Sequence, residues 1–233
     1  MDKVYNTVEA AVEDVFDGAV IAFGGFFSAG RPAGLTKALA KRNVKDLTIV
    51  LQQVGPGNEE ILDLVTNGQI RKAICNYPFP RSASKGADHP FEQAVKKGEI
   101  ALEVFPMGTF VEKLRCAGAG LPAFYTPTGV GTVVAEGKEV RVFNGREALL
   151  ELALTVDFTF VHAWKGDREG NLIYHDTAQN YNTAMAMAGA ITIAEVEFLH
   201  AVGDLNGNGI HTPGIFVKRV VETGRPDLEI ADI

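Results

Sequence analysis

Three glycines in one short segment carry the clearest chemical signal in this sequence. Gly24 and Gly25 end the apolar run 19–23, and Gly30 follows shortly before Pro32. A buried strand, a tight loop and the first turn of a helix give this pattern in α/β domains. Because glycine lacks a β-carbon, a ligand can approach the main-chain N–H groups of such a loop closely. The segment therefore predicts a ligand-binding loop.

The order of the glycines excludes two common nucleotide fingerprints. A dinucleotide-binding fold requires G-x-G-x-x-G, whereas the loop reads Gly24-Gly25-Phe26-Phe27-Ser28-Ala29-Gly30. The Walker pattern G-x-x-x-x-G-K-[ST] is also absent from the sequence. On the local pattern alone, the glycines either bind a ligand or only make a turn.

Two histidines lie near polar residues but lack the spacing of a known site. His162 and His175 flank Trp164 and Asp167. They match neither a serine triad nor a metal motif such as H-E-x-x-H, and we predict no metal site.

The other charged candidates have simpler interpretations. Arg31, Arg81 and Lys165 adjoin loops and could meet a phosphate or a carboxylate, as any basic residue beside a loop could. Several carboxylates are interpreted as helix-start, capping or surface charges: Glu59, Glu60, Glu112, Glu136 and Glu169.

The first half of the chain alternates strands with helices. This order favours an α/β fold with an open, mostly parallel twisted sheet and helices on both faces. The expected elements there are a short helix within 3–16, strands 19–23, 46–51, 70–76 and 101–105, helix 32–42, a helix capped by Asn58 and closed by Gly68, and helix 90–97. Thr109 and Glu112 have capping-box spacing for the next helix.

The second half has a less regular pattern. It begins with a long loop, 117–132, of a kind that is more often functional than not. The expected elements after it are a hairpin of 132–135 and 139–143, helix 146–154, strand 156–162, loop 165–171, a short segment 172–174, a loop-to-helix stretch 177–187, and strands 190–196 and 214–221. We expect a single domain over 1–233, with a frayed tail after Gly224.

The composition is typical of a globular protein and does not favour binding to nucleic acid or membranes. Of its 233 residues, 46% are hydrophobic and 22% charged, and the formal net charge is −7. A negative chain does not suit general binding of nucleic acid or anionic lipid. The N-terminus lacks a signal-peptide pattern, and no apolar run is long enough for a membrane span. Cys75 and Cys116 form no C-x-x-C pair and are expected to be reduced and buried, so we predict a cytoplasmic protein.

The glycine segment and several later motifs together resemble one family, the family I coenzyme A transferases, and in particular their A-type (alpha) subunits. The resemblance begins with Asp17-Gly18 and Ile21-Ala22-Phe23-Gly24-Gly25-Phe26, followed by Gly30 and Pro32. It continues in Pro106-Met107-Gly108-Thr109, in 118–129, in Phe143-Asn144-Gly145, in Ala163-Trp164-Lys165-Gly166-Asp167, in Gly170-Asn171 and in Asn180-Tyr181-Asn182. These matches keep their order and cover about 18–221.

The resemblance implies an enzyme that moves coenzyme A from an acyl-CoA to a free short-chain carboxylic acid. In that family the nucleophile is a glutamate that forms an anhydride and then a glutamyl-CoA thioester, and it lies in the homologous partner subunit within Ser-Glu-Asn-Gly. That motif does not occur in this sequence. The resemblance therefore implies a hetero-oligomer in which this chain has no catalytic nucleophile, coenzyme A is a substrate and covalent intermediate, and no cofactor is permanently bound. It also implies that Gly24, Gly25, Phe26, Phe27, Ser28, Ala29 and Gly30 contact coenzyme A.

The acid pocket departs from the family pattern. Many 3-oxoacid transferases read Pro-Gln-Gly-Thr where this chain has Pro106-Met107-Gly108-Thr109, and methionine offers only a weak acceptor. The segment 75–80 also differs from the Ser-Ser-Tyr of that branch. We therefore expect an acid other than acetoacetate or 3-oxoadipate. Met107, Gly108, Asn180 and Asn182 are our candidates for the pocket lining, although the asparagines would equally suit caps or turns.

Two other functions stay open on the sequence. A sugar-phosphate isomerase of similar architecture would bind phosphate at the glycine loop and act without a partner. A non-catalytic module would bind acyl-CoA or regulate another protein.

Overall fold

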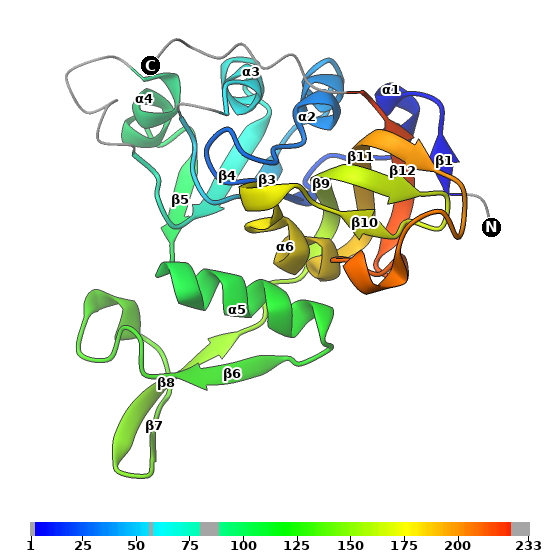
Figure 1. Ribbon diagram of the computed structural model, residues 1–233. Helices are drawn as coiled ribbons and strands as arrows, with labels where there is room; N and C mark the ends of the chain where they lie inside the picture. The colour runs from blue at the N-terminus through cyan, green and yellow to red at the C-terminus, as the bar shows by residue number, and fades with distance from the viewer. Residues whose placement is uncertain (1–2, 56–57, 80–88, 225–233) are drawn as a thin grey trace.

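A parallel sheet forms the centre of the molecule. The computed structural model describes residues 3–55, 58–79 and 89–224. Within these ranges the sheet has nine strands in the order β1-β12-β11-β9-β2-β3-β4-β5, and β10 pairs antiparallel with β9 (Figure 1). In chain order these strands are β1 (Val4–Tyr5), β2 (Val20–Phe23), β3 (Leu47–Val50), β4 (Ile70–Cys75), β5 (Ala101–Val104), β9 (Val156–Asp167), β10 (Leu172–Ile173), β11 (Gly189–His200) and β12 (Val217–Glu222).

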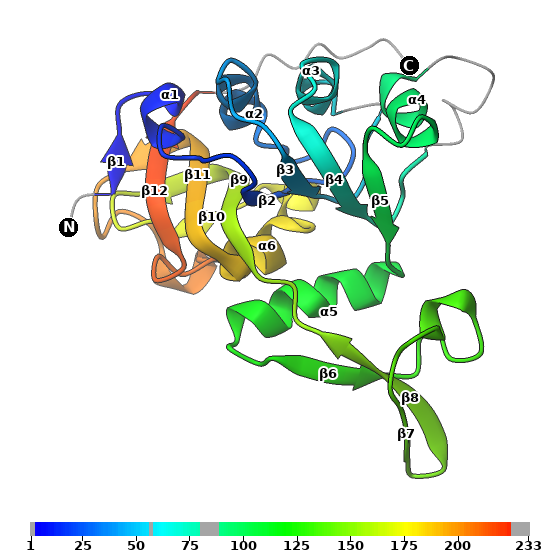
Figure 2. The same cartoon turned by 180° about the vertical axis from the view of Figure 1, so that it is seen from behind.

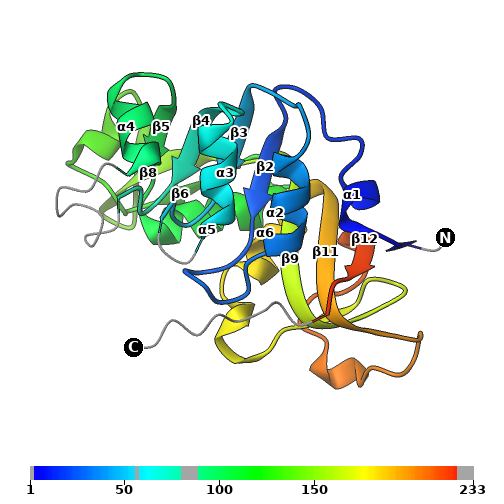
Figure 3. The ribbon, with the colours of Figure 1, turned by 90° about the horizontal axis from the view of Figure 1, so that it is seen from above.

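Helices cover both faces of this sheet, which confirms the predicted fold class. On one face lie α1 (Val8–Ala11), α2 (Ala33–Ala40), α3 (Glu60–Thr66) and α4 (Pro90–Lys96), and on the other lie α5 (Met107–Gly118) and α6 (Asn182–Ala188) (Figures 1 and 3). Leu35 and Phe160 belong to the buried core under α1–α4, while Phe110 and Met185 belong to the core on the α5 and α6 side. Three 3₁₀ turns complete the described elements: Val133–Ala135, Asp176–Gln179 and Gly207–Gly209.

The strand order reverses between β2 and β9. From β2 the chain adds β3, β4 and β5 toward one edge, and from β9 it adds β11 and β12 toward the other. The helices that make these connections lie on opposite faces of the sheet, as right-handed crossovers require. In open α/β sheets, ligands bind outside the carboxyl ends of the strands at such a reversal. The glycine loop follows β2 and therefore lies at this point.

A second, antiparallel sheet lies beyond α5. Its strands are β6 (Ala123–Thr126), β7 (Val140–Phe143) and β8 (Arg146–Leu152), in the order β6-β8-β7 (Figure 2). We call residues 119–155 the arm. Buried Glu151 on β8 joins the arm to α5, because its carboxylate pairs with Lys113 at 3.0 Å and also with Lys138.

The arm corrects three sequence predictions. Residues 146–152 form strand β8 and not a helix, although glutamate, alanine and leucine favour helices. Pairing with β6 on one side and β7 on the other outweighs that intrinsic preference. The predicted loop 117–132 contains β6. The predicted hairpin strand 132–135 is replaced by a 3₁₀ turn, Val133–Ala135, because β7 pairs with β8.

Further boundaries also differ from the predictions. Thr109 is not a cap, because α5 already begins at Met107, after the extended residue Pro106. The residue preceding α3 is Glu59, not Asn58, and it makes no side-chain cap bond. Strand β9 continues to Asp167, into the predicted loop.

The segment before α6 and the N-terminal segment also differ from the predictions. The stretch 177–187 divides into a 3₁₀ turn and α6, with Asn180 between them. The predicted N-terminal helix shrinks to α1, and strand β1 before it pairs with β12. The predicted tail after Gly224 lies outside the described residues.

Candidate active site at the glycine loop

The glycine loop is a tight, closed turn at the carboxyl end of β2. Gly24 donates its N–H to the carbonyl of Phe160 on β9 at 2.9 Å. Phe26 and Ala29 exchange two main-chain hydrogen bonds of 3.0 Å each. Phe27, at the tip between them, has φ 50°, a value that is strained for an aromatic residue. Such strain is characteristic of residues held in place for function.

Two asparagines hold the loop from the segment that leads into α6. Asn182 is fully buried, and its Nδ2 donates to the carbonyls of Gly30 and Ala178 at 2.8 Å each. Asn180 donates from Nδ2 to the carbonyl of Ala29 at 3.0 Å. Both side chains therefore bind the loop itself, and their role as pocket lining stays a prediction.

A row of aromatic rings connects the loop to α5. The ring of Phe26 stacks on Tyr181 with centroids 6.2 Å apart, and Tyr181 meets Phe110 edge to face at 6.0 Å. The Tyr181 hydroxyl also accepts a hydrogen bond of 3.2 Å from Nδ2 of Asn76, which follows β4. Loop, β4 and the first turn of α5 thus form one packed unit at the carboxyl edge of the sheet.

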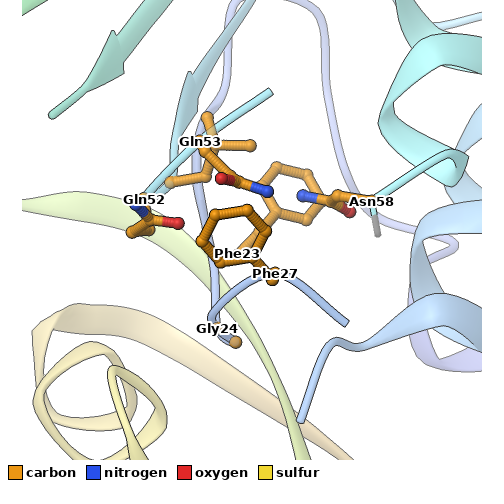
Figure 4. Close-up of a pocket in the computed structure, with 8 residues that line it drawn as sticks. Phe23, Gly24, Phe27, Gln52, Gln53 and Asn58 are labelled. Carbon is orange, nitrogen blue, oxygen red and sulfur yellow. The ribbon is translucent and has the colours of Figure 1, made fainter. Parts of the chain in front are cut away.

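A small pocket opens beside Gly24 and Gly25. Figure 4 shows the side chains of Gln52, Gln53 and Asn58 around it, with Phe27 close to the glycine turn. Its lining residues are Phe23, Gly24, Gly25, Phe27, Leu51, Gln52, Gln53 and Asn58. All of these side chains are uncharged.

Two buried carboxyl groups, those of Glu60 and Glu195, hold the base of the loop. Arg31 pairs with Glu59 at 3.0 Å and with the buried Glu60 at 2.6 Å, so its cationic group is already engaged within this chain. Behind it, Glu195 on β11 accepts a hydrogen bond of 2.8 Å from the N–H of Leu35 in the first turn of α2. Burial raises the pKa of the Glu195 carboxyl to about 8.

The two histidines near Trp164 occupy different environments. His162 is buried on β9, and neither of its ring nitrogens has a hydrogen-bond partner among the described residues. Burial lowers its pKa to about 4, so the ring is neutral. His175 is exposed and packs edge to face on Trp164, with centroids 5.1 Å apart.

Three of the other predicted residues lie on α5 and β9. Met107 and Gly108 form the exposed first turn of α5, and a β-carbon on Gly108 would meet no atom within 4 Å. Lys165 lies over the ring of Trp164, 4.1 Å from its centroid. Arg81 lies outside the described residues.

The free cysteines are buried, as expected. Burial raises the pKa of the Cys75 thiol to about 12, which keeps it protonated and unreactive. Among the described residues, no cluster of histidine, cysteine and carboxylate side chains could hold a metal ion.

Sequence reasoning did not single out Gln52 or Tyr181 as site residues. The sequence nevertheless contains a signal that could have indicated each of these two residues. Gln52 directly follows a buried strand at the predicted carboxyl edge of the sheet, and Tyr181 stands between the two asparagines that were singled out.

Comparison with known proteins identifies the family. The family model described as "Coenzyme A transferase" matches residues 5–223. The chain is 42% identical over 221 residues to the A-type subunit of 3-oxoadipate CoA-transferase from Pseudomonas putida, covering 95% of this chain and 94% of that one. It is 43% identical over 221 residues to the A-type subunit of the probable succinyl-CoA:3-ketoacid coenzyme A transferase from Bacillus subtilis, covering 95% and 90%.

The fold has a close structural counterpart. Glutaconate coenzyme A-transferase from Acidaminococcus fermentans superimposes with a TM-score of 0.82 at 18% identity, over 95% of this chain and 76% of that one. The match to the family model and the identity to the curated relatives show that the chain belongs to the coenzyme A transferase family. It is the A-type subunit of a heteromeric transferase. In the described part of the chain, no helix has both the length and the apolar character to cross a membrane.

Proposed function

We propose that this chain supplies half of a shared active site, in which its glycine loop binds coenzyme A and a B-type partner subunit supplies the nucleophile. The observation that carries the proposal is the closed loop 24–30, held by Asn180 and Asn182 at the point where the strand order reverses. Its exposed tip, Phe26 to Ser28, offers main-chain groups and rings to a ligand, and the loop is prepared before the ligand arrives.

The buried glutamates of this chain support a nucleophile on the partner. Glu60 is paired with Arg31, Glu151 is paired with two lysines, and Glu195 holds the start of α2. Each carboxyl therefore has a structural task. The partner would bring its glutamate, within Ser-Glu-Asn-Gly, to the open side of the loop.

The reaction then proceeds in two half-reactions. The partner's glutamate carboxylate attacks the acyl-CoA carbonyl, forms an acyl-glutamyl anhydride and releases the CoA thiolate. The thiolate attacks the glutamyl carbonyl of the anhydride, which gives the glutamyl-CoA thioester and frees the first acid. The second acid repeats these steps in reverse and leaves as its own acyl-CoA. The task of this chain is to keep coenzyme A in place during both half-reactions.

The acceptor is a short-chain carboxylic acid. The relatives are named for 3-oxoadipate and for succinyl-CoA and a 3-ketoacid, so 3-oxo acids are the reference substrates. Met107 replaces an amide by an apolar group at the exposed start of α5, close in sequence to Phe110 of the ring row. We propose that this change shifts the preference to another acid. A panel of short acids tests it: acetoacetate or 3-oxoadipate having the highest kcat/KM would refute the shift.

Co-expression tests the divided site. This chain together with its partner should transfer coenzyme A between an acyl-CoA and a free acid, and this chain alone should not. Mass spectrometry after incubation with acyl-CoA should find the covalent CoA adduct on the partner. Transfer by the isolated chain, or an adduct on it, would overturn the proposal.

The same assays separate the alternative functions. A sugar-phosphate isomerase would act without a partner, and a binding module would bind acyl-CoA without transfer even when a Ser-Glu-Asn-Gly partner is present. The buried, reduced cysteines suit the cytoplasmic location that we propose.

A further inference from the structure

The pocket beside the glycine turn has a chemical character that selects one part of a ligand. Carboxamides, aromatic rings and Leu51 line it together with the Gly24 and Gly25 main chain, and it contains no charged side chain among the described residues. Its free volume is about 10 Å³, room for one small group of the size of a water molecule. A phosphate group would find no opposite charge in this lining. A neutral chain that passes over the opening could place a single N–H in it.

Gln52 presents an unused hydrogen-bond acceptor to this pocket. The residue is 3% exposed, and its Oε1 is buried without a partner among the described residues. Its main chain is held by the segment that follows β4, because its carbonyl accepts from the N–H of Asn76 at 3.4 Å and of Tyr77 at 3.1 Å. Buried acceptors are normally satisfied, and an unsatisfied one costs stability. An unsatisfied acceptor at the ligand-binding edge of the sheet therefore indicates that the ligand itself supplies the hydrogen-bond donor.

Coenzyme A consists of a charged nucleotide and a neutral pantetheine arm with two amide groups. Only the pantetheine arm carries N–H donors on an uncharged chain. We propose that Oε1 of Gln52 accepts a hydrogen bond from a pantetheine amide N–H as pantetheine crosses the Gly24–Gly25 turn. This inference rests on the proposed function and assigns the neutral pantetheine, not the nucleotide, to this part of the chain.

The test uses the complete two-chain enzyme and the variant Gln52→Met, which keeps the side-chain length and removes the acceptor. Three acyl donors are compared: acyl-CoA, acyl-pantetheine and an S-alkyl thioester without an amide. We expect kcat/KM to fall about tenfold for the first two donors, the worth of one buried hydrogen bond, and less than twofold for the alkyl thioester. Gln93→Met on α4 is the matched control and should change none of them.

Stability gives a readout that separates binding from folding. Gln52→Met removes the amide N–H donors together with the unpaired acceptor, so the melting temperatures of the free variant and the free wild type measure the effect on folding alone. Calorimetry with free pantetheine supplies a further measurement, for which we expect about tenfold weaker binding by the variant. Equal losses for all three donors, or unchanged pantetheine binding, would overturn the inference.

The failure of this inference is distinguishable from failure of the proposed function. A wild-type complex that transfers no coenzyme A contradicts the function itself. A wild-type complex that transfers normally, beside a Gln52→Met complex with unchanged kinetics, contradicts only the role of Gln52.

Discussion

The side chain of Asn182 occupies the space where residue 24 would carry a β-carbon. A β-carbon built on Gly24 would stand 1.8 Å from Oδ1 of Asn182, well inside contact distance. The same amide donates to the carbonyl of Gly30. The glycine loop and the start of α6 are therefore fitted together atom by atom, although about 150 residues separate them in the sequence.

Gly24→Ala should destabilise the protein by about 1–3 kcal/mol, because the methyl group forces the buried Asn182 amide out of its hydrogen bonds. The melting temperature should fall by roughly 2–4 °C for each kcal/mol. Gly108→Ala is the matched control. No atom lies within 4 Å of its β-carbon position, and alanine favours the helix by up to about 1 kcal/mol. A Gly24→Ala variant as stable as the wild type would contradict the fit.

Asn182→Ala should cost about 1–3 kcal/mol, because the carbonyls of Gly30 and Ala178 lose their donor. In the complete enzyme, kcat/KM for acyl-CoA should fall roughly tenfold or more, since the loop is no longer held in its binding shape. Urea unfolding and steady-state kinetics measure both effects. The exposed Asn208→Ala is the control, and an equal response of the two variants would argue against a specific role for Asn182.

Glu195 and His162, partners in register on β11 and β9, should give opposite pH dependences of stability. The pKa of Glu195 is raised from 4.5 to about 8, so its stabilising contribution is complete below pH 4.5 and is lost as the pH rises through 8. The pKa of His162 is lowered from 6.5 to about 4, so its contribution is complete above pH 6.5 and is lost as the pH falls through 4. Each slope is at most about 1.4 kcal/mol per pH unit.

Between pH 4.5 and 6.5 these two trends oppose each other, and above pH 6.5 the loss from Glu195 remains. Urea midpoints at pH values of about 5.5, 6.5, 7.5 and 8 should therefore fall on the alkaline side for the wild type. Glu195→Gln should remove that fall, whereas the exposed Glu147→Gln should keep it. Parallel pH profiles of Glu195→Gln and the wild type would show that Glu195 does not titrate in this range. The negative charge of nearby Glu60 also raises the pKa of Glu195, as burial does.

Glu151→Ala should cost about 3–5 kcal/mol, because it leaves Lys113 buried and without its counter-charge. The effect should concentrate in the arm, where amide hydrogen exchange should accelerate more than in the central sheet. Glu147→Ala, exposed on the same strand, should change stability by less than about 0.5 kcal/mol. Uniform acceleration over the whole chain would contradict a local role for Glu151 in holding the arm.

The sequence was sufficient for the parallel half of the fold because that half depends on local patterns. Strands β2 and β3 are almost entirely apolar, strands β4 and β5 are apolar apart from Arg71, Lys72 and Glu103, and the loop after β2 contains its own turn residues. Segment 146–152 shows where this reasoning fails. Its residues favour a helix, and only pairing with β6 and β7, which is a matter of tertiary context, makes it a strand.

The site was predictable in its main-chain part and not in its side-chain part. Glycines and a proline marked the loop through backbone geometry alone. The tasks of Asn180 and Asn182, and the orientation of Gln52, depend on which elements become neighbours in space. The pairing of Arg31 with Glu60 likewise required the position of α3 beside the loop.

The fit between Gly24 and Asn182 has a consequence for how this family can change through evolution. A larger residue at 24 is accommodated only if position 182 becomes smaller, and a smaller residue at 182 leaves the loop unheld. Neither single step is neutral, so the two positions should be inherited together and should vary together across related sequences.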